Sequence, residues 1–183
     1  MARKTIKVVD VVTDSHDVEQ KHLKIAQNTA RKHRKNTERR QAKMLLSKFK
    51  HTVDAKNRVF IPAKYREELG ETFVVSKSLR QPCLQVYSME QWEAYISPIT
   101  KMDRKDSEPI LRRILRDAEQ VSPDSQGRIV LPSELVKKAN IGKSAVIVGC
   151  CTYAEIWAEE EYDKMIEEED PADLIDRLEA FGL

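Results

Sequence analysis

The feature that most constrains this chain is an internal duplication. The stretch VDAKNRVFIP (residues 53–62) is matched by PDSQGRIVLP (residues 123–132), with an Asp-x-x-x-Arg turn, three apolar residues and a proline in each copy. The copies are offset by 70 residues, and the same offset relates Tyr87 to Trp157. This duplication predicts two small tandem modules with the same order of elements. Small modules bury little apolar surface, so we also expect homo-oligomers.

The residue pattern in each copy predicts a small β-rich module. In the first copy, residues 49–53 and 58–61 predict two strands around a turn, followed by a short helix that ends at Gly70. Residues 72–76 and 83–87 predict two further strands, and the second copy repeats this order. The pattern therefore predicts a mainly β fold of the α+β class, with short helices and a pseudo-two-fold arrangement of the copies.

Capping residues and apolar spacing predict the longer helices. Ser88 opens a Ser-x-x-Gln capping box, and the helix that follows has one apolar face formed by Trp92, Tyr95 and Ile96. Residues 98–109 form a charged connection with a proline at each end. Residues 110–118 then predict an amphipathic helix whose inward side chains are Ile110, Ile114, Leu115 and Ala118. Residues 171–183 predict a last helix that packs on its own subunit or on a partner through Leu174, Leu178 and Phe181.

The charges are distributed unevenly along the chain. Residues 1–50 carry 14 basic and 5 acidic side chains, whereas residues 159–183 carry 2 basic and 11 acidic ones. The basic end favours a polyanionic partner, and the acidic end is either a solvated helix face or a surface for self-contact. The sequence has no apolar run of membrane-spanning length and no signal-peptide core, so we expect a cytoplasmic protein without a membrane partner.

The repeated turn has the residues needed to hold a tight loop. Asp54 and Asp124 open the two copies, and an aspartate at that position can accept hydrogen bonds from backbone N–H groups further along the turn. Asn57 and Gly127 precede the arginines, and both residue types tolerate a left-handed backbone. We therefore expect these four residues to fix the two turns.

The candidate DNA-binding side chains follow from this turn. Arg58 and Arg128 restart the strand after each turn, and a guanidinium group matches guanine edges and phosphate oxygens. Lys56 and Lys64 lie nearby in the first copy and could add phosphate contacts. A simpler interpretation is that each arginine only pairs with its aspartate and staples the turn, and the spacing alone does not separate the two interpretations.

Four stretches of this sequence together resemble one known family. They are MLLSKFKHTVDAKNRVFIPAKYREELG (residues 44–70), CLQVYSMEQWEAY (83–95), DSQGRIVLPSEL (124–135) and AEIWAEEEYD (154–163). With the paired turns in this order, residues 44 to about 162 resemble MraZ, the bacterial regulator family built from two tandem SpoVT/AbrB-type domains. The chain departs from the family at Asn57, where glycine is usual.

The resemblance implies a sequence-specific DNA-binding transcriptional regulator that recognises short direct repeats in promoter DNA. It also implies a repressor of its own division and cell-wall gene cluster, a ring-like homo-oligomer, and a location in the cytoplasm and nucleoid. We divide the chain into a basic N-terminal extension (1–43), a first SpoVT/AbrB-like small β-barrel domain (44–95), a helical connection (96–118), a second such domain (119–162), and an acidic C-terminal helix or tail (163–183).

Other classes of protein fit the sequence less well. The four histidines and three cysteines lack metal-ligand spacing, and no phosphate-binding glycine loop or nucleophile elbow occurs, so we expect no enzyme activity, metal, cofactor or small-molecule substrate. We expect Cys83, Cys150 and Cys151 to be buried as small apolar residues. An AbrB-type global regulator or antitoxin is the nearest alternative. A basic RNA-binding module at residues 21–50 is weaker because stacking aromatics are missing.

Residues 1–43 precede the region of resemblance. Their polar segment at residues 27–43 has alanine as its only apolar residue type, so a helix there could not dock on a core, and we expect disorder or a frayed helix. One hypothesis is that Met44 is the true start and that codons for Arg39 and Arg40 form a ribosome-binding site. The competing hypothesis is a basic arm that adds nonspecific phosphate contacts.

Overall fold

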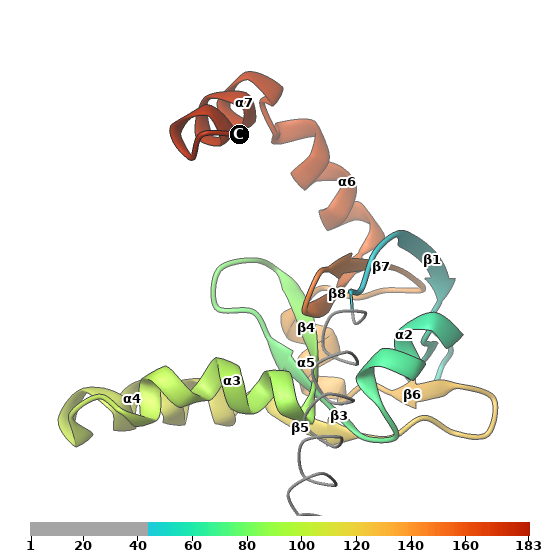
Figure 1. The fold of residues 1–183 in the computed structure, drawn as a ribbon. Helices are drawn as coiled ribbons and strands as arrows, with labels where there is room; N and C mark the ends of the chain where they lie inside the picture. The colour runs from blue at the N-terminus through green and yellow to red at the C-terminus, as the bar shows by residue number, and fades with distance from the viewer. Residues whose placement is uncertain (1–43) are drawn as a thin grey trace, which may run out of the picture. The chain divides into compact units, whose positions relative to one another are not determined.

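The computed structural model describes residues 44–183 (Figure 1). The predictions for residues 1–43, including the leader and basic-arm hypotheses, lie outside the described residues. Within the described part of the chain, no helix is long and apolar enough to cross a membrane.

Both sequence copies form the same series of elements. The first copy contains β1 (Lys48–Thr52), β2 (Arg58–Phe60), α2 (Ala63–Leu69), β3 (Phe73–Lys77), β4 (Cys83–Ser88), α3 (Met89–Thr100) and α4 (Arg104–Leu115). The second copy contains β5 (Ala118–Val121), β6 (Arg128–Val130), α5 (Ser133–Lys138), β7 (Ser144–Cys150), β8 (Tyr153–Ala158), α6 (Glu159–Glu168) and α7 (Pro171–Ala180). This composition confirms the predicted α+β class with mainly antiparallel strands.

The two copies interleave in one six-stranded sheet. Its strand order is β1-β7-β8-β4-β3-β5, and every pair is antiparallel (Figure 1). The outer strands are exchanged, because β1 of the first copy pairs with β7 of the second and β5 of the second pairs with β3 of the first. The boundaries predicted at residues 44–95 and 119–162 divide the sequence, but in space the two copies share this sheet.

A separate two-stranded ribbon lies on the axis that relates the copies. In it β2 and β6 pair antiparallel, with Val59 opposite Ile129 at the centre. Two hydrogen bonds extend the exchange beyond the strands: the Ile61 amide donates to the Gly127 carbonyl (3.0 Å), and the Leu131 amide donates to the Asn57 carbonyl (2.9 Å). Each turn is thus tied to the strand of the other copy.

The hydrophobic core joins the ribbon to the sheet. Val59 and Ile129 are fully buried and belong to the same cluster as residues of the long sheet, among them Phe73, Val75, Leu84, Ile147 and Ile156. The helix α2 contributes Tyr65, whose hydroxyl donates to the Ser47 carbonyl (2.6 Å). Burial raises the pKa of Tyr65 to about 12, so this donor keeps its proton. Residues from both copies are therefore needed to complete one core.

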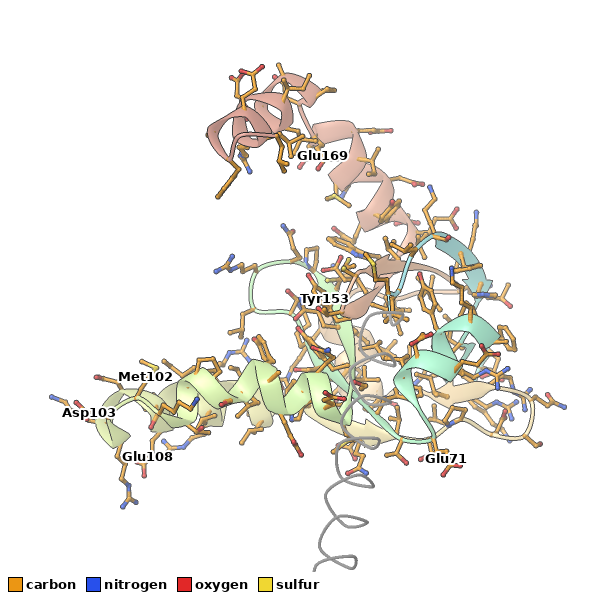
Figure 2. The ribbon with its side chains drawn as sticks, viewed as in Figure 1. Glu71, Met102, Asp103, Glu108, Tyr153 and Glu169 are labelled. Carbon is orange, nitrogen blue, oxygen red and sulfur yellow. The ribbon has the colours of Figure 1, made fainter. Side chains whose placement is uncertain are left out.

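The segment between the copies is more helical than predicted. Residues 98–109 were expected to be a charged connection, yet Pro98 lies inside α3 and Pro109 lies inside α4. A proline removes one helical hydrogen bond, yet both helices continue through their prolines and pack against each other. The Asp103 turn joins the two helices at their tip, where Met102 also lies (Figure 2).

The predicted burial of the helix at residues 110–118 is partly wrong. Ile114 is buried as expected, but Leu115 is 50% exposed. Ala118 is not helical at all, because it pairs with Ser76 as part of β5. Pairing with the edge of the sheet thus overrides the helical spacing at the end of this segment.

The last helix begins as predicted but does not pack. Pro171 occupies its first turn, and the Asp170 carboxylate accepts a hydrogen bond from the Ala172 amide (2.9 Å). Every residue from Pro171 to Leu183 is exposed. The expected inward packing of Leu174, Leu178 and Phe181 on the same subunit is therefore wrong.

The three cysteines have different environments. Cys83 is fully buried, as predicted, and burial raises its pKa to about 12. Cys150 is only partly buried, and Cys151 is exposed with a left-handed backbone (φ 67°) in the tight turn between β7 and β8. The predicted burial is wrong for Cys151, because the tip of a tight turn between two paired strands lies in solvent.

Candidate nucleic-acid interface

The first Asp-x-x-x-Arg turn is held by one carboxylate. Oδ1 of Asp54 accepts hydrogen bonds from the backbone amides of Lys56 (2.8 Å) and Arg58 (2.9 Å). Oδ2 of the same side chain accepts a hydrogen bond from Nε of Arg58 at 2.6 Å. The Asn57 amide donates to the Asp54 carbonyl (2.9 Å), which closes the turn. Asp54 therefore orders both the loop backbone and the arginine that follows it.

The second turn repeats this arrangement. Oδ1 of Asp124 accepts hydrogen bonds from the backbone amides of Gln126 and Arg128, both at 2.9 Å. Oδ2 accepts Nε (2.9 Å) and Nη2 (2.8 Å) of Arg128. Both arginines thus pair with the aspartate four residues earlier, as the simpler interpretation of the sequence expects. The side chains of Arg58 and Arg128 each remain 31% exposed, so pairing does not remove them from the surface.

The position before each arginine has a left-handed backbone. Its φ is 56° at Asn57 and 77° at Gly127. At the second turn a side chain would meet the guanidinium of Arg66, since a Cβ on Gly127 would lie 2.7 Å from Arg66 Cζ. At the first turn, Nδ2 of Asn57 instead donates to the Ser133 hydroxyl (3.1 Å). Asparagine is therefore accommodated at position 57 by a hydrogen bond to α5 of the other copy.

Hydrogen bonding keeps the turn aspartates ionised. The backbone amide of Arg58, followed by its side chain and the Lys56 amide, lowers the pKa of Asp54 to about 2. The backbone amide and then the side chain of Arg128 lower the pKa of Asp124 in the same direction. Each turn consequently holds a carboxylate paired with a guanidinium throughout the physiological pH range.

The ribbon presents both arginines on one face. Side chains alternate along a strand, so Arg58 and Phe60 of β2 share a face with Arg128 and Val130 of β6. The opposite face carries Val59 and Ile129, which are buried. Val130 is 58% exposed, which identifies the arginine face as the solvent face. Arg58 lies opposite Val130, so the two arginines occupy diagonal positions, whose Cα atoms are roughly 7–8 Å apart in an antiparallel pair.

The two lysines predicted to contact phosphate are both exposed on the first copy. Lys56 is exposed in the turn, and Lys64 is exposed in the first turn of α2. Sequence reasoning missed Arg66, whose guanidinium lies 5.7 Å from the Phe60 ring centroid and whose Nε donates to the Ile61 carbonyl (3.0 Å). The sequence signal that could have identified Arg66 is a difference between the copies, because the equivalent residue of the second copy is Val136.

Among residues 44–183, no cluster of three histidine, cysteine or acidic side chains is arranged to hold a metal ion.

Known proteins match both copies of this chain. The family described as "MraZ protein, putative antitoxin-like" matches residues 44–113 and again residues 114–180. A transcriptional regulator MraZ of Clostridium tetani is 40% identical over 123 residues, covering 66% of this chain and 86% of that protein. Its namesake from a Thermoanaerobacter species is 44% identical over 126 residues, covering 66% and 85%. The one from Caldanaerobacter subterraneus is 38% identical over 147 residues, covering 76% and 100%.

These matches span both copies and the greater part of each relative's length. The relatives are named as regulators of transcription and not as enzymes, in agreement with the predicted class. The chain therefore belongs to the MraZ family of transcriptional regulators.

Proposed function

We propose that this chain binds promoter DNA sequence-specifically through the outer face of the β2–β6 ribbon. The single observation that carries the proposal is the presence of Arg58 and Arg128 on one solvent-facing ribbon, each held by an aspartate of its own turn. Arginine on a rigid backbone reads guanine through two parallel hydrogen bonds, and each such pair contributes about 1–3 kcal/mol of discrimination. The aspartates limit the rotamers of the arginines before DNA arrives.

The dimensions of the ribbon suit the major groove. That groove is about 12 Å wide and admits a two-stranded β-ribbon. The diagonal separation of roughly 7–8 Å between the two arginine Cα atoms corresponds to about two base-pair steps of about 3.4 Å each. One ribbon can therefore contact two nearby base pairs, which is a short recognition element.

Lysines give the affinity that does not depend on sequence. Lys56 lies two residues before Arg58 in the first turn and Lys64 lies in the first turn of α2, and both are exposed and free to contact phosphate groups. Each phosphate contact releases condensed counterions and makes binding weaker as salt is raised. Arg66 contributes to the same positive surface, although its Nε is engaged by the Ile61 carbonyl.

A single ribbon supplies few contacts, so several subunits must act together. We infer a homo-oligomer, as in the ring implied by the family resemblance, that engages short direct repeats in the promoter. Linking several weak sites raises the effective concentration of each after the first has bound. In this proposal the protein represses the division and cell-wall gene cluster that contains its own gene, and it acts in the cytoplasm and nucleoid.

The proposal is tested by DNA binding in solution. Fluorescence anisotropy would compare DNA from upstream of the protein's own gene with a scrambled duplex of the same length. Arg58→Ala and Arg128→Ala should each abolish the preference for the promoter, whereas Arg112→Ala, an exposed arginine on α4, should not change it. Native mass spectrometry checks that all variants keep the same subunit number. Tight, promoter-specific binding by the Arg58→Ala, Arg128→Ala double variant would contradict the proposal.

A further inference from the structure

The last helix carries an apolar stripe with no cover. Leu174, Ile175, Leu178 and Phe181 occur at spacings that place them on one side of α7 and its C-terminal end. Their exposed fractions are 39%, 55%, 50% and 86%. A contiguous stripe of large apolar side chains on an otherwise acidic helix is typical of a helix that docks on another surface.

The equivalent helix of the first copy is packed. The family match assigns α4 to the end of the first repeat and α7 to the end of the second. In α4, Ser107 and Ile114 are buried, and the helix contacts α3, β3 and β5. By contrast, every residue of α7 is exposed, and Glu169 marks the point where α7 departs from α6 (Figure 2). The same element of the repeat is thus covered in one copy and open in the other.

A concave site of suitable character lies where β4 and α3 of the first copy meet the start of β8. A cavity of about 480 Å³ is lined on its apolar side by Leu79, Tyr87, Ala94, Tyr95 and Tyr153. The Tyr87 ring stacks with Tyr95 and with Tyr153, with a centroid distance of 5.2 Å in both pairs, and Tyr153 is labelled in Figure 2. The lining side chains include no carboxylate, and the charged one among them is Arg80.

The corresponding residues of the second copy pack together and are buried. There Trp157 replaces Tyr87 and Tyr162 replaces Trp92, and their rings pack edge to face at 6.1 Å. Both are buried in a cluster with Cys83 and Val146. The cavity is therefore built on β4 and α3 of the first copy and completed by Thr152 and Tyr153 of the second, whereas the uncovered helix belongs to the second copy.

We propose that α7 of one subunit docks its apolar stripe into the Tyr87–Tyr153 cavity of a second copy of this chain. The inference deepens the homo-oligomer of the proposed function and rests on that part of it. A concave, aromatic-lined site with one arginine matches an apolar helix flanked by acidic side chains, which here belong to a segment with 11 acidic and 2 basic residues.

Charge decides which surfaces meet. Contact between two α7 helices would bring two strongly acidic segments together, which electrostatic repulsion disfavours. Contact between α7 and the cavity pairs the acidic segment with Arg80. The two surfaces are different, so the contact is heterologous, and each subunit retains a free helix and a free cavity for further neighbours. A heterologous contact closes into a ring when its rotation allows.

The test uses two surface variants of the full chain and native mass spectrometry. Leu178→Asp places a charge in the stripe, and Leu79→Asp, at a side chain 51% exposed, places one at the cavity. Both should reduce the assembly to single chains of 21.1 kDa. Ala180→Asp on the opposite side of α7 and Met102→Asp at the α3–α4 tip are matched controls that should leave the wild-type assembly intact. Circular dichroism confirms that all four variants are folded.

Mixing the two disrupted variants gives the decisive measurement. Leu178→Asp retains an intact cavity and Leu79→Asp retains an intact helix, so an equimolar mixture should form 1:1 heterodimers and stop there. An unchanged assembly in the Leu178→Asp variant would overturn the α7 contact while leaving the proposed homo-oligomer standing. Dissociation by Leu178→Asp but not by Leu79→Asp would overturn the cavity as the receiving site. A monomeric wild-type chain would overturn the oligomer itself, whereas the promoter-binding measurement judges DNA recognition separately.

Discussion

Gly127 of the second turn lies directly beneath the guanidinium of Arg66 from the first copy. A Cβ at position 127 would lie 2.7 Å from Arg66 Cζ and 2.8 Å from its Nε. Arg66 is itself held by the Ile61 carbonyl and by the Phe60 ring, so it has little freedom to retreat. The second turn is thus closed by a residue of the other copy, and this contact explains why the two turns tolerate different residues before the arginine.

Substitution at this contact should reveal the asymmetry. Gly127→Asn should lower the free energy of unfolding by about 1–3 kcal/mol, because it adds both a side chain under Arg66 and strain at φ 77°. Asn57→Gly, the matched change in the first turn, should cost under about 1 kcal/mol, since glycine tolerates φ 56° and loses only the bond to Ser133. Urea unfolding measures both values. Combining Gly127→Asn with Arg66→Val should recover part of the loss, and a fully additive double variant would contradict the contact.

The first turn should weaken in acid. Hydrogen bonds to the ionised carboxylate hold the pKa of Asp54 at about 2, below its ordinary value of 3.8. A lowered folded-state pKa stabilises the fold above the unfolded-state pKa, and this contribution disappears as the pH falls from about 4 to about 2. Asp54→Asn should remove that part of the pH dependence. NMR titration of the Asp54 carboxyl tests the cause directly, and a midpoint near 4 in the folded protein would refute it.

The buried Asp117 should matter more than surface ion pairs. Its side chain is 3% exposed and pairs with Arg113 of α4 and Lys138 of α5, so it links the two copies. Asp117→Ala should lower the free energy of unfolding by about 1–3 kcal/mol, because it removes a buried partner of two cations that can still reach water. Glu108→Ala breaks the exposed pair with Arg104 and should cost about 0.5 kcal/mol or less. Equal losses in the two variants during chemical denaturation would argue against this ranking.

Lysines and arginines of the ribbon should affect DNA binding differently. Lys56→Ala or Lys64→Ala should weaken binding to promoter and scrambled DNA alike and reduce the slope of log K against log salt by about 1 each. Arg128→Ala should instead abolish the preference for promoter DNA, because every subunit of the oligomer loses a contact that contributes about 1–3 kcal/mol of discrimination. Anisotropy titrations at several salt concentrations separate the two effects. A lysine variant that loses sequence preference without a change in salt slope would reverse the assignment.

The cysteines should differ sharply in reactivity. Cys151 is exposed in the β7–β8 turn, whereas burial removes Cys83 from solvent and raises its pKa to about 12. A thiol reagent at neutral pH should therefore modify Cys151 in the folded protein and reach Cys83 only after unfolding. Mass spectrometry of digested samples locates the modified residues. Rapid labelling of Cys83 under native conditions would mean that the sheet opens around it.

Much of the local structure was predictable because short stretches encode it. An aspartate followed four residues later by arginine, with Asn57 or Gly127 between them, specifies the turn through hydrogen bonds and backbone conformation alone. Ser88 likewise specifies the start of α3, where its hydroxyl accepts the Gln91 amide (3.2 Å). The duplication itself required only a comparison of the sequence with itself. The prediction of secondary structure failed where pairing between distant strands decided the outcome. Ala118, for example, joins the edge of the sheet instead of continuing a helix.

The sequence by itself therefore determined the repeat, the chemistry of each turn and the mainly β class, since each depends on residues close together in the chain. The tertiary structure decided that β1 and β5 exchange between copies, that Arg58 and Arg128 share one face, and that α7 is left uncovered. Those features depend on which segments, some 40 residues or more apart, bury one another's apolar surface. The packing of the whole chain decides which segments pair, and the periodicity within a single segment does not predict that choice.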